Sequence, residues 1–273
     1  MIRMLVEAEA DAARPCHTGG VEESYRKQRR PAEIGSIPDV LQMFTREVRF
    51  YREIAPSINV RVPACRRAEI AADGATRLDL EDLSAWRLGA DPEAAAGTLR
   101  LLHDRWEVEA GRRWAWLPRA DVTHLVDALF TRSWTEGRHR RDLSSRVRDL
   151  GDRLVGRVAE VEHRASVAAP LTLTHGDASS LNLRTSPDGE IALLDWEDVG
   201  LGPGVTDLAW HLVSSVDPAS WDDALASYGP HDGLAACLPA AAIQACLSLL
   251  DEPEDAVSVA GWVSRLEEVA RRI

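Results

Sequence analysis

The sequence predicts a two-lobed α+β protein with a short β-rich amino-terminal lobe and a mainly helical carboxy-terminal lobe. Two observations place the β-structure: short alternating runs flank an Asp-Gly turn at residues 73–74, and others flank a Pro-Asp-Gly turn at 187–189. Glycine supplies the positive φ that such turns need. The third observation is helical periodicity over most of the chain after residue 91. We expect an abbreviated amino-terminal lobe over residues 1–83 and the helical lobe over 84–273.

Single elements follow from periodicity and from proline. The first 36 residues show no clear period and yield only provisional strands. Apolar residues at helical spacing predict a helix from about Pro38 to Ala55, which Pro56 ends. The segment Asp91-Pro92-Glu93 opens another helix, because proline is well tolerated in a first helical turn. Further helices are expected over roughly 120–165.

Composition excludes some classes of protein. A chain of 273 residues with 45% hydrophobic residues can bury one large core or two modest ones. The formal net charge of −12 argues against a nucleic-acid partner, since phosphate contacts need a basic face. No apolar run approaches the roughly 20 residues of a membrane span, and the first residues lack the apolar stretch of a signal peptide. We expect a cytoplasmic protein that binds neither nucleic acid nor a membrane.

The cysteines indicate no metal or disulfide site. Four of them are scattered along the chain without a C-x-x-C pair and without histidines at zinc-ligand spacing: Cys16, Cys65, Cys237 and Cys246. We expect these thiols to be buried or to take no part in metal binding or disulfide formation.

One polar cluster carries recognisable chemistry. His175-Gly176-Asp177 is followed by Asn182, five residues after the aspartate, and the second strand of the later hairpin leads to Asp195. Transfer of a phosphoryl group needs a carboxylate that orients the attacking hydroxyl and accepts its proton, and Mg²⁺ that neutralises phosphate oxygens. Amide and carboxylate oxygens suit Mg²⁺. A lone aspartate on a loop is usually a turn residue, but Asn182 is one of only two asparagines in the chain. The combination predicts a phosphoryl-transfer centre.

The motif H-G-D-x-x-x-x-N, followed by D-W-E, resembles the aminoglycoside phosphotransferase and choline kinase branch of the protein kinase-like superfamily. The likeness covers about residues 44–211 and implies a protein kinase-like fold. It implies that Asp177 is the catalytic base and that Asn182 and Asp195 bind Mg²⁺. His175 would support the catalytic loop, and Asp207 would brace it.

The same resemblance implies an ATP site in the amino-terminal lobe. Glu47 lies on the expected lobe helix, where the family has a glutamate that pairs with a phosphate-binding lysine. Lys27, the only lysine in the chain, is the candidate for that partner. The segment Leu80-Glu81-Asp82-Leu83 resembles the hinge, whose backbone groups would hydrogen-bond adenine.

The amino-terminal lobe also departs from the family pattern. No glycine-rich loop is evident, and Lys27 lies in a basic cluster without alternating apolar neighbours. On the residues alone, Lys27 is equally well interpreted as a solvated surface lysine, and Glu47 as a helix residue that pairs with nearby arginines. An altered amino terminus, a reduced ATP clamp and a loss of activity each explain these departures.

Three functions are therefore compared. The leading hypothesis is an ATP-dependent kinase that phosphorylates a hydroxyl of a small molecule, with an amine-bearing acceptor compatible with the acidic chain. The alternative is a degenerate kinase that binds a nucleotide or another ligand without turnover. A magnesium-dependent hydrolase ranks lowest, because two-metal sites usually recruit more carboxylates than this loop offers. The identity of the acceptor is not readable from the sequence.

Overall fold

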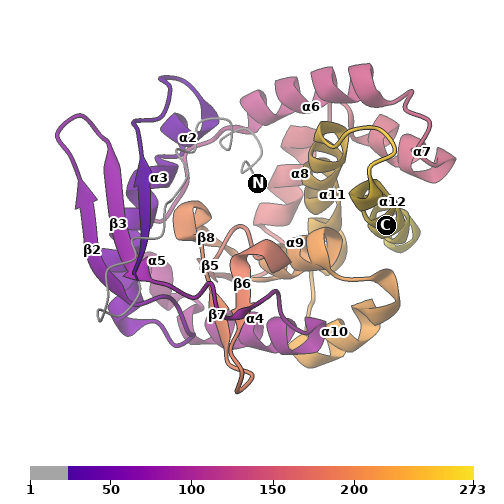
Figure 1. The fold of residues 1–273 in the computed structure, drawn as a ribbon. Helices are drawn as coiled ribbons and strands as arrows, with labels where there is room; N and C mark the ends of the chain where they lie inside the picture. The colour runs from indigo at the N-terminus through magenta and orange to yellow at the C-terminus, as the bar shows by residue number, and fades with distance from the viewer. Residues whose placement is uncertain (1–23) are drawn as a thin grey trace. The chain divides into compact units, whose positions relative to one another are not determined.

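The computed structural model describes residues 24–273 (Figure 1). Cys16 and the first part of the provisional strands lie outside the described residues. By contacts, the chain divides into two compact units. The first unit contains the described residues up to Ala90 together with His175–Gly200, and the second contains Asp91–Thr174 and Leu201–Ile273. Strands are concentrated in the first unit and helices in the second, so the predicted α+β class is confirmed.

The first unit contains a three-stranded antiparallel sheet in the order β1-β3-β2. Strand β1 spans Ser24–Arg29, β2 spans Cys65–Ile70 and β3 spans Thr76–Glu81. The predicted hairpin is the pair β2 and β3, whose turn contains Gly74 at φ +90°. Lys27 lies on β1 opposite Leu78 of β3. The basic cluster is thus part of a paired strand, although both faces of β1 carry polar residues.

The predicted helix between Pro38 and Ala55 is built from several shorter pieces. Helix α2 spans Ile37–Val40 and α3 spans Met43–Arg49, with a left-handed residue at the start of α3. A π-helical turn over Phe50–Ile54 and a 3-10 turn over Ala55–Ser57 follow directly. α3 packs against β2 and β3. Because a π turn is wider than an α turn, it changes the direction in which the next side chains point.

A second small sheet, in the order β4-β6-β7, brings the later hairpin into the first unit. Strand β4 spans Arg87–Leu88, β6 spans Leu183–Thr185 and β7 spans Ile191–Leu193. The backbone N–H of Leu193 donates to the carbonyl of Arg61 at 2.9 Å. These backbone contacts explain why the hairpin groups with the first unit. The lobe boundary expected between residues 83 and 84 stays a prediction.

The second unit is mainly helical, and β5 (Leu171–Thr174) pairs with β8 (Gly200–Pro203). As predicted, one helix starts at Pro92, where the Asp91 side chain accepts hydrogen bonds from the N–H groups of the first turn. Its helices are α4 (Pro92–Trp106), α5 (Glu109–Arg113), α6 (Thr123–Gly137), α7 (Ser145–Leu154), α8 (Val158–Ser166), α9 (Val205–Ser215), α10 (Trp221–Tyr228), α11 (Leu234–Asp251) and α12 (Val257–Arg272).

Helix α11 is the one helix of the described residues that is long and apolar enough to cross a membrane by length and composition. The expectation that no apolar run approaches the length of a membrane span missed this helix. Half of it is buried within the protein, and it packs against α8, α9 and α12. Its two cysteines, Cys237 and Cys246, are buried and form no disulfide among the described residues. These contacts are typical of the central helix of a protein core.

Helices α6 and α7 approach each other closely at a glycine. Trp134 on α6 is buried, and its indole N–H donates to Asp152 of α7 at 2.8 Å. Gly151 of α7 lies against the same ring, since a Cβ at this position would be 2.1 Å from a ring carbon of Trp134. A side chain at residue 151 therefore requires the indole to move.

We expect Gly151→Ala to destabilise the protein, although alanine favours helix formation by up to about 1 kcal/mol. Overpacking a filled core typically costs about 1–3 kcal/mol, and the displaced Trp134 also loses its hydrogen bond. Urea denaturation followed by tryptophan fluorescence measures the change in free energy of unfolding. Gly97→Ala in α4 is the matched control, because a Cβ there meets only Ser227 Oγ at 3.5 Å. Equal stability of the two variants would contradict the described packing.

Candidate active site

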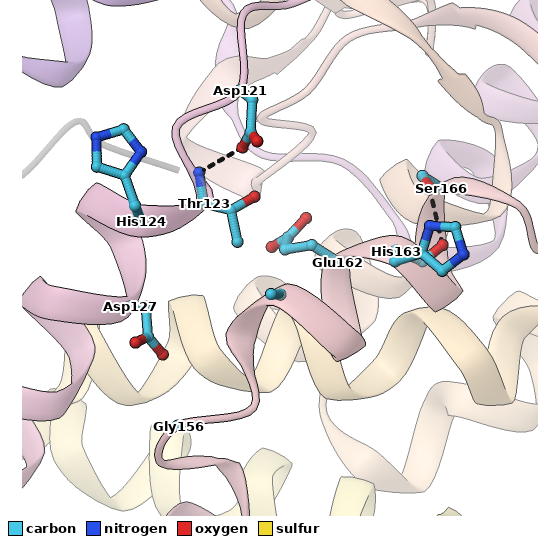
Figure 2. A pocket seen from close by; sticks show the side chains of 9 residues that line it. Asp121, Thr123, His124, Asp127, Gly156, Glu162, His163 and Ser166 are labelled. Atoms are coloured by element: carbon cyan, nitrogen blue, oxygen red, sulfur yellow. Dashed lines mark hydrogen bonds between the residues drawn. The ribbon is translucent and has the colours of Figure 1, made fainter.

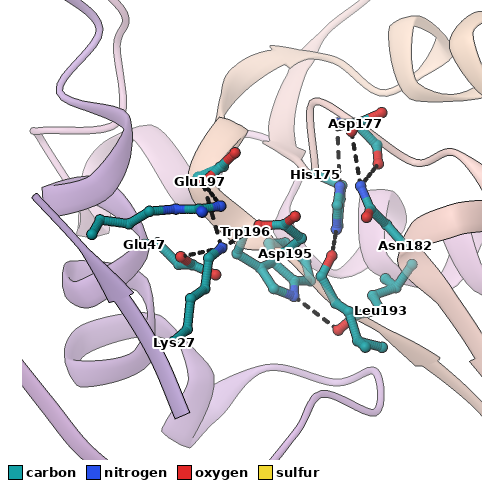
Figure 3. Close-up of polar contacts among 11 residues, drawn as sticks. Lys27, Glu47, His175, Asp177, Asn182, Leu193, Asp195, Trp196 and Glu197 are labelled. Atoms are coloured by element: carbon teal, nitrogen blue, oxygen red, sulfur yellow. Dashed lines mark hydrogen bonds and ion pairs between the residues drawn. The ribbon is translucent and has the colours of Figure 1, made fainter. Parts of the chain in front are cut away.

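Lys27 lies among three carboxylates of the first unit (Figure 3). Its ammonium is 2.7 Å from Glu47 Oε2 and 3.4 Å from Glu197 Oε2, and it donates a hydrogen bond to Asp195 Oδ1. Only 10% of the Lys27 side chain is exposed. Ligand oxygens of the three carboxylates lie within 4.8 Å of one another. Their mutual repulsion is offset by the ammonium at their centre.

Burial and charge act in opposite directions on these groups. Burial alone would lower the pKa of Lys27, but the three carboxylates, Asp195 most strongly, hold it well above its usual value. Burial raises the pKa of Glu47, and Lys27 offsets part of that effect. Burial also raises the pKa of Glu197 to about 7, with Lys27 lowering it and Asp195 raising it. Lys27 therefore keeps its positive charge over the pH range in which Glu197 gains or loses a proton.

Asp195 is held in place by its backbone and by its neighbour in sequence. It has a left-handed backbone with φ +63°, a conformation that aspartate adopts more readily than most residues. The next residue, Trp196, is buried and stacks on Phe50 of the π-helical turn, with ring centroids 4.1 Å apart and planes 7° from parallel. Its indole N–H donates to the carbonyl of Leu193 at 3.1 Å. These contacts fix the residues that precede and follow Asp195 in the turn after β7.

A second polar group surrounds Asp177 (Figure 3). The Asn182 amide donates to Asp177 Oδ2 at 2.8 Å and to the Asp177 carbonyl at 2.9 Å. The backbone N–H of Asp177 donates to His175 Nδ1 at 3.2 Å, and His175 Nε2 lies 2.8 Å from the carbonyl of Leu194. Because a carbonyl only accepts, the ring carries its proton on Nε2. His175 thereby links the Asp177 loop to the residue before Asp195.

A pocket of about 200 Å³ in the first unit contains members of both polar groups. Apolar and charged side chains share its lining, a composition typical of small-molecule sites. The lining residues predicted from the sequence are Lys27, Glu47, the hinge residues Leu80, Glu81, Asp82 and Leu83, Asn182 and Asp195. The others are Tyr25, Arg29, Tyr51, Pro63, Ser84, Leu181, Arg184 and Leu194.

The carboxylate of Glu81 is already engaged within the first unit. Arg61 Nη2 donates to its two oxygens at 2.5 and 2.6 Å, and the backbone N–H of Ala64 donates at 3.0 Å. Burial alone would raise the pKa of Glu81, but these hydrogen bonds outweigh it, and the pKa is lowered. Glu81 lines the pocket at the end of β3, and Leu83, which is buried, lines it as well.

Asp207 takes part in a polar contact of the second unit. Its carboxylate is buried and lies 3.1 Å from His103 Nε2, and His103 Nδ1 lies 2.9 Å from the hydroxyl of Tyr228. Gly204 allows this approach, because a Cβ there would be 2.5 Å from the His103 ring. The contact joins α4, α9 and α10, and the brace that the sequence predicts for Asp207 stays a prediction.

The second unit has a pocket of its own, of about 700 Å³, between parts of α6 and α8 (Figure 2). Three carboxylates line it, those of Asp121, Asp127 and Glu162. One buried oxygen of Asp127 has no hydrogen-bond partner among the described residues. Burial raises the pKa of Glu162, while Arg119 lowers it and Asp121 raises it. The excess of carboxylates favours a cationic ligand.

Three residues of the carboxylate cluster and the pocket were not predicted as site residues. Glu197 follows Asp195 by two residues and is the last residue of the D-W-E motif. The motif would have indicated Glu197 if this glutamate had been considered as a partner of Lys27. Arg29 follows Lys27 by two residues, and the alternation of a strand would have placed both on one face. Tyr51 is placed in the pocket by the π-helical turn, for which the sequence carries no clear signal.

The chain has a protein kinase-like fold. The chain belongs to the phosphotransferase enzyme family, whose model matches residues 34–240. A sequence comparison with curated proteins gave no match.

Solved structures with the same fold include three antibiotic phosphotransferases. The chain is 15% identical to aminoglycoside phosphotransferase APH(3'')-Id from Streptomyces rimosus, in complex with ADP and streptomycin, with TM-score 0.53 over 89% of this chain and 96% of that one. It is 14% identical to the GDP complex of aminoglycoside 2'-phosphotransferase-IIIa, with TM-score 0.55 over 99% and 96%. Spectinomycin phosphotransferase APH(9)-Ia, with ADP and spectinomycin, is 10% identical, with TM-score 0.54 over 99% and 98%. At these identities the likeness establishes the fold.

The raised pKa of Glu197 predicts a pH dependence of stability. The folded protein keeps a proton on Glu197 that the unfolded chain releases between about pH 4.5 and pH 7, so the free energy of unfolding falls as pH rises through this window. The contribution is on the order of 3 kcal/mol. Glu197→Gln should remove this part of the slope.

Denaturation of both proteins between pH 4.5 and 8 in EDTA measures the difference between the two slopes. Glu190→Gln, on the exposed hairpin turn, is the matched control and should keep the wild-type slope. Parallel profiles for wild type and Glu197→Gln would show that Glu197 titrates normally in the folded protein.

Proposed function

We propose that the protein is an ATP-dependent kinase that transfers a phosphoryl group to a hydroxyl of a small molecule in the cytoplasm. The observation that carries this proposal is the pairing of Lys27 with both Glu47 and Asp195 in a pocket that Asn182 also lines. A cation, two oxygen ligands for a metal and a nearby carboxylate base are the parts that phosphoryl transfer requires. Membership of the phosphotransferase enzyme family supports the same reaction class.

In this proposal Lys27 binds nucleotide phosphate, and Glu47 holds the lysine in position. The ion pair is almost fully buried, so the ammonium has few alternative positions. The hinge contributes backbone groups between Glu81 and Leu83 for the adenine, since the Glu81 carboxylate is occupied by Arg61. Apolar residues of the same pocket, such as Leu80 and Leu194, offer surface for the base.

Asn182 and Asp195 are the proposed Mg²⁺ ligands. Both line the same pocket, and their amide and carboxylate oxygens are the hard donors that Mg²⁺ prefers. The donor set therefore fits the ion. When bound, Mg²⁺ would supply positive charge that neutralises phosphate oxygens. The buried contact between Trp196 and Phe50 keeps the Asp195 carboxylate oriented toward the pocket.

Asp177 is the proposed catalytic base. Its carboxylate is oriented by the Asn182 amide at one oxygen, and its backbone N–H is fixed by His175. An acceptor hydroxyl that hydrogen-bonds to this carboxylate is oriented for attack, and its proton passes to a carboxylate oxygen of Asp177. His175 keeps the loop in register with Leu194 and does not itself exchange the proton of the substrate.

The acceptor that fits the charge of the protein best is an amine-bearing alcohol. The acidic pocket of the second unit, with Asp121, Asp127 and Glu162, attracts ammonium groups. Two of the similar solved structures contain streptomycin or spectinomycin as a ligand. Nucleic acid and membranes are not proposed as partners, in line with the net charge of −12.

One observation favours the degenerate-kinase alternative. The ammonium of Lys27 donates to Asp195, so the lysine and the proposed metal ligand neutralise each other. A nucleotide with its Mg²⁺ must separate this pair in order to bind productively. If Lys27 and Asp195 do not separate, the protein would bind a ligand without transferring a phosphoryl group.

We expect Asp177→Asn to reduce kcat on the order of 10²- to 10⁴-fold, because asparagine cannot accept the proton. The Kd for Mg-ATP should stay near the wild-type value. ADP formation is measured with a panel of aminoglycosides, macrolides, choline-like amines, amino alcohols and sugars. Asp188→Asn, on the exposed hairpin turn, is the matched control and should keep full activity.

The same assay separates the three functions. A wild-type protein that binds Mg-ATP but forms no ADP with any alcohol would support the degenerate kinase. ADP formation without an added alcohol would support the hydrolase. ADP formation that depends strictly on one class of alcohol, and on Asp177, would support the kinase.

A further inference from the structure

Arg29 is a second cation in the pocket of Lys27. Alternate residues of a strand point to the same face, so Arg29 shares the face of Lys27 on β1, and both line the pocket. The Arg29 side chain is 19% exposed, whereas Arg26, on the opposite face of the strand, is 48% exposed. Arg26 hydrogen-bonds Asp79 at 3.0 Å, outside this pocket. The two arginines of one strand therefore have different environments.

Among the described residues, the guanidinium of Arg29 has few hydrogen-bond partners for a largely buried group. Its Nη2 is 3.7 Å from Glu197 Oε2, which is an ion pair but too long for a hydrogen bond. Its Cζ lies 5.6 Å from the centroid of the Phe44 ring. The Nε atom is buried, and none of the described residues accepts its hydrogen bond. A buried donor without an acceptor carries a desolvation cost.

Structural arginines of the same protein look different. Arg140 donates to the carbonyls of Leu249 and Glu252 and pairs with Asp142 through two hydrogen bonds. Arg61 donates from Nη2 to both carboxylate oxygens of Glu81 and from Nη1 to the carbonyl of Val62. Each of these guanidinium groups joins separate segments through several donors. Arg29 makes no such set of contacts within residues 24–273, although it lines the pocket.

The charge balance of the pocket indicates what Arg29 binds. Glu47, Asp195 and Glu197 already share the single ammonium of Lys27. A nucleoside triphosphate adds several negative charges, and Lys27 alone leaves this excess largely uncompensated. A guanidinium suits phosphate particularly well, because its planar fork can donate two parallel hydrogen bonds.

We propose that Arg29 is a second phosphate-binding residue of the nucleotide site, which donates two hydrogen bonds from its guanidinium to a phosphate group of the nucleotide. This inference rests on the proposed function and extends it from the lysine to the next residue on the same face of β1. Glu197 holds the guanidinium near the pocket until the phosphate arrives. The ligand class is a nucleotide with at least two phosphates.

The test compares nucleotide binding by wild type, Arg29→Gln and Arg26→Gln. Calorimetric titration with ATP, ADP and adenosine, each in the presence of Mg²⁺, gives the Kd of each ligand. We expect Arg29→Gln to weaken ATP binding on the order of 10- to 100-fold, as loss of a hydrogen bond to a charged group predicts, with no change for adenosine. Arg26→Gln should bind all three ligands as wild type does. Arg29→Lys, which keeps the charge but not the fork, should lie between wild type and Arg29→Gln.

Two results would overturn the inference while leaving the kinase proposal intact. One is unchanged ATP affinity in Arg29→Gln. The other is an equal loss for ATP and adenosine, which indicates a disturbed pocket rather than a lost phosphate contact. If Arg29→Gln does not fold, Arg29→Lys decides, because ATP and adenosine affinities equal to those of wild type in that variant would contradict a forked contact. A wild-type protein that binds no nucleotide at all would instead contradict the proposed function, and the inference with it.

Discussion

The first unit depends on one interaction, the burial of the Lys27 ammonium among the carboxylates of Glu47, Asp195 and Glu197. The three carboxylates come from α3 and from the turn after β7, so a single cation ties β1 to two distant parts of the chain. Removing one partner of a buried ion pair leaves an uncompensated charge, which typically costs about 3–5 kcal/mol. The same groups would meet the phosphates and Mg²⁺ in the proposed reaction. Stability and function therefore rest on the same charges.

Aromatic packing keeps these charges in position. Trp196 lies between Phe50, on which it stacks, and the His175 ring, whose centroid is 4.5 Å away. Because Trp196 follows Asp195 and Phe50 follows α3, this stack joins the segment of the proposed metal ligand to the helix that carries Glu47. His175 in turn fixes the Asp177 loop through its hydrogen bond to the Leu194 carbonyl. Rigid supports of this kind orient the groups of an active site.

The sequence predicted the parts of this site that depend on local spacing. Asp177 and Asn182 are five residues apart on one loop, and the hairpin that follows returns the chain to Asp195, so their proximity follows from turn geometry. β1 was less predictable, because its polar residues alternate on both faces and its pairing with β3 is a long-range contact. The roles of Glu197 and Arg29 depend on where Lys27 lies in space. No local pattern reveals such a partner before the sheet is known.

A double-mutant cycle between Lys27 and Glu47 tests the central claim most directly. The free energies of unfolding of wild type, Lys27→Met, Glu47→Gln and the double variant are measured by urea denaturation at one pH. If the buried pair organises the first unit, the two changes are coupled by on the order of 1–3 kcal/mol, since losing the second partner costs less once the first is gone. Additive effects, within about 0.5 kcal/mol, would show that Lys27 and Glu47 act independently and would contradict the account.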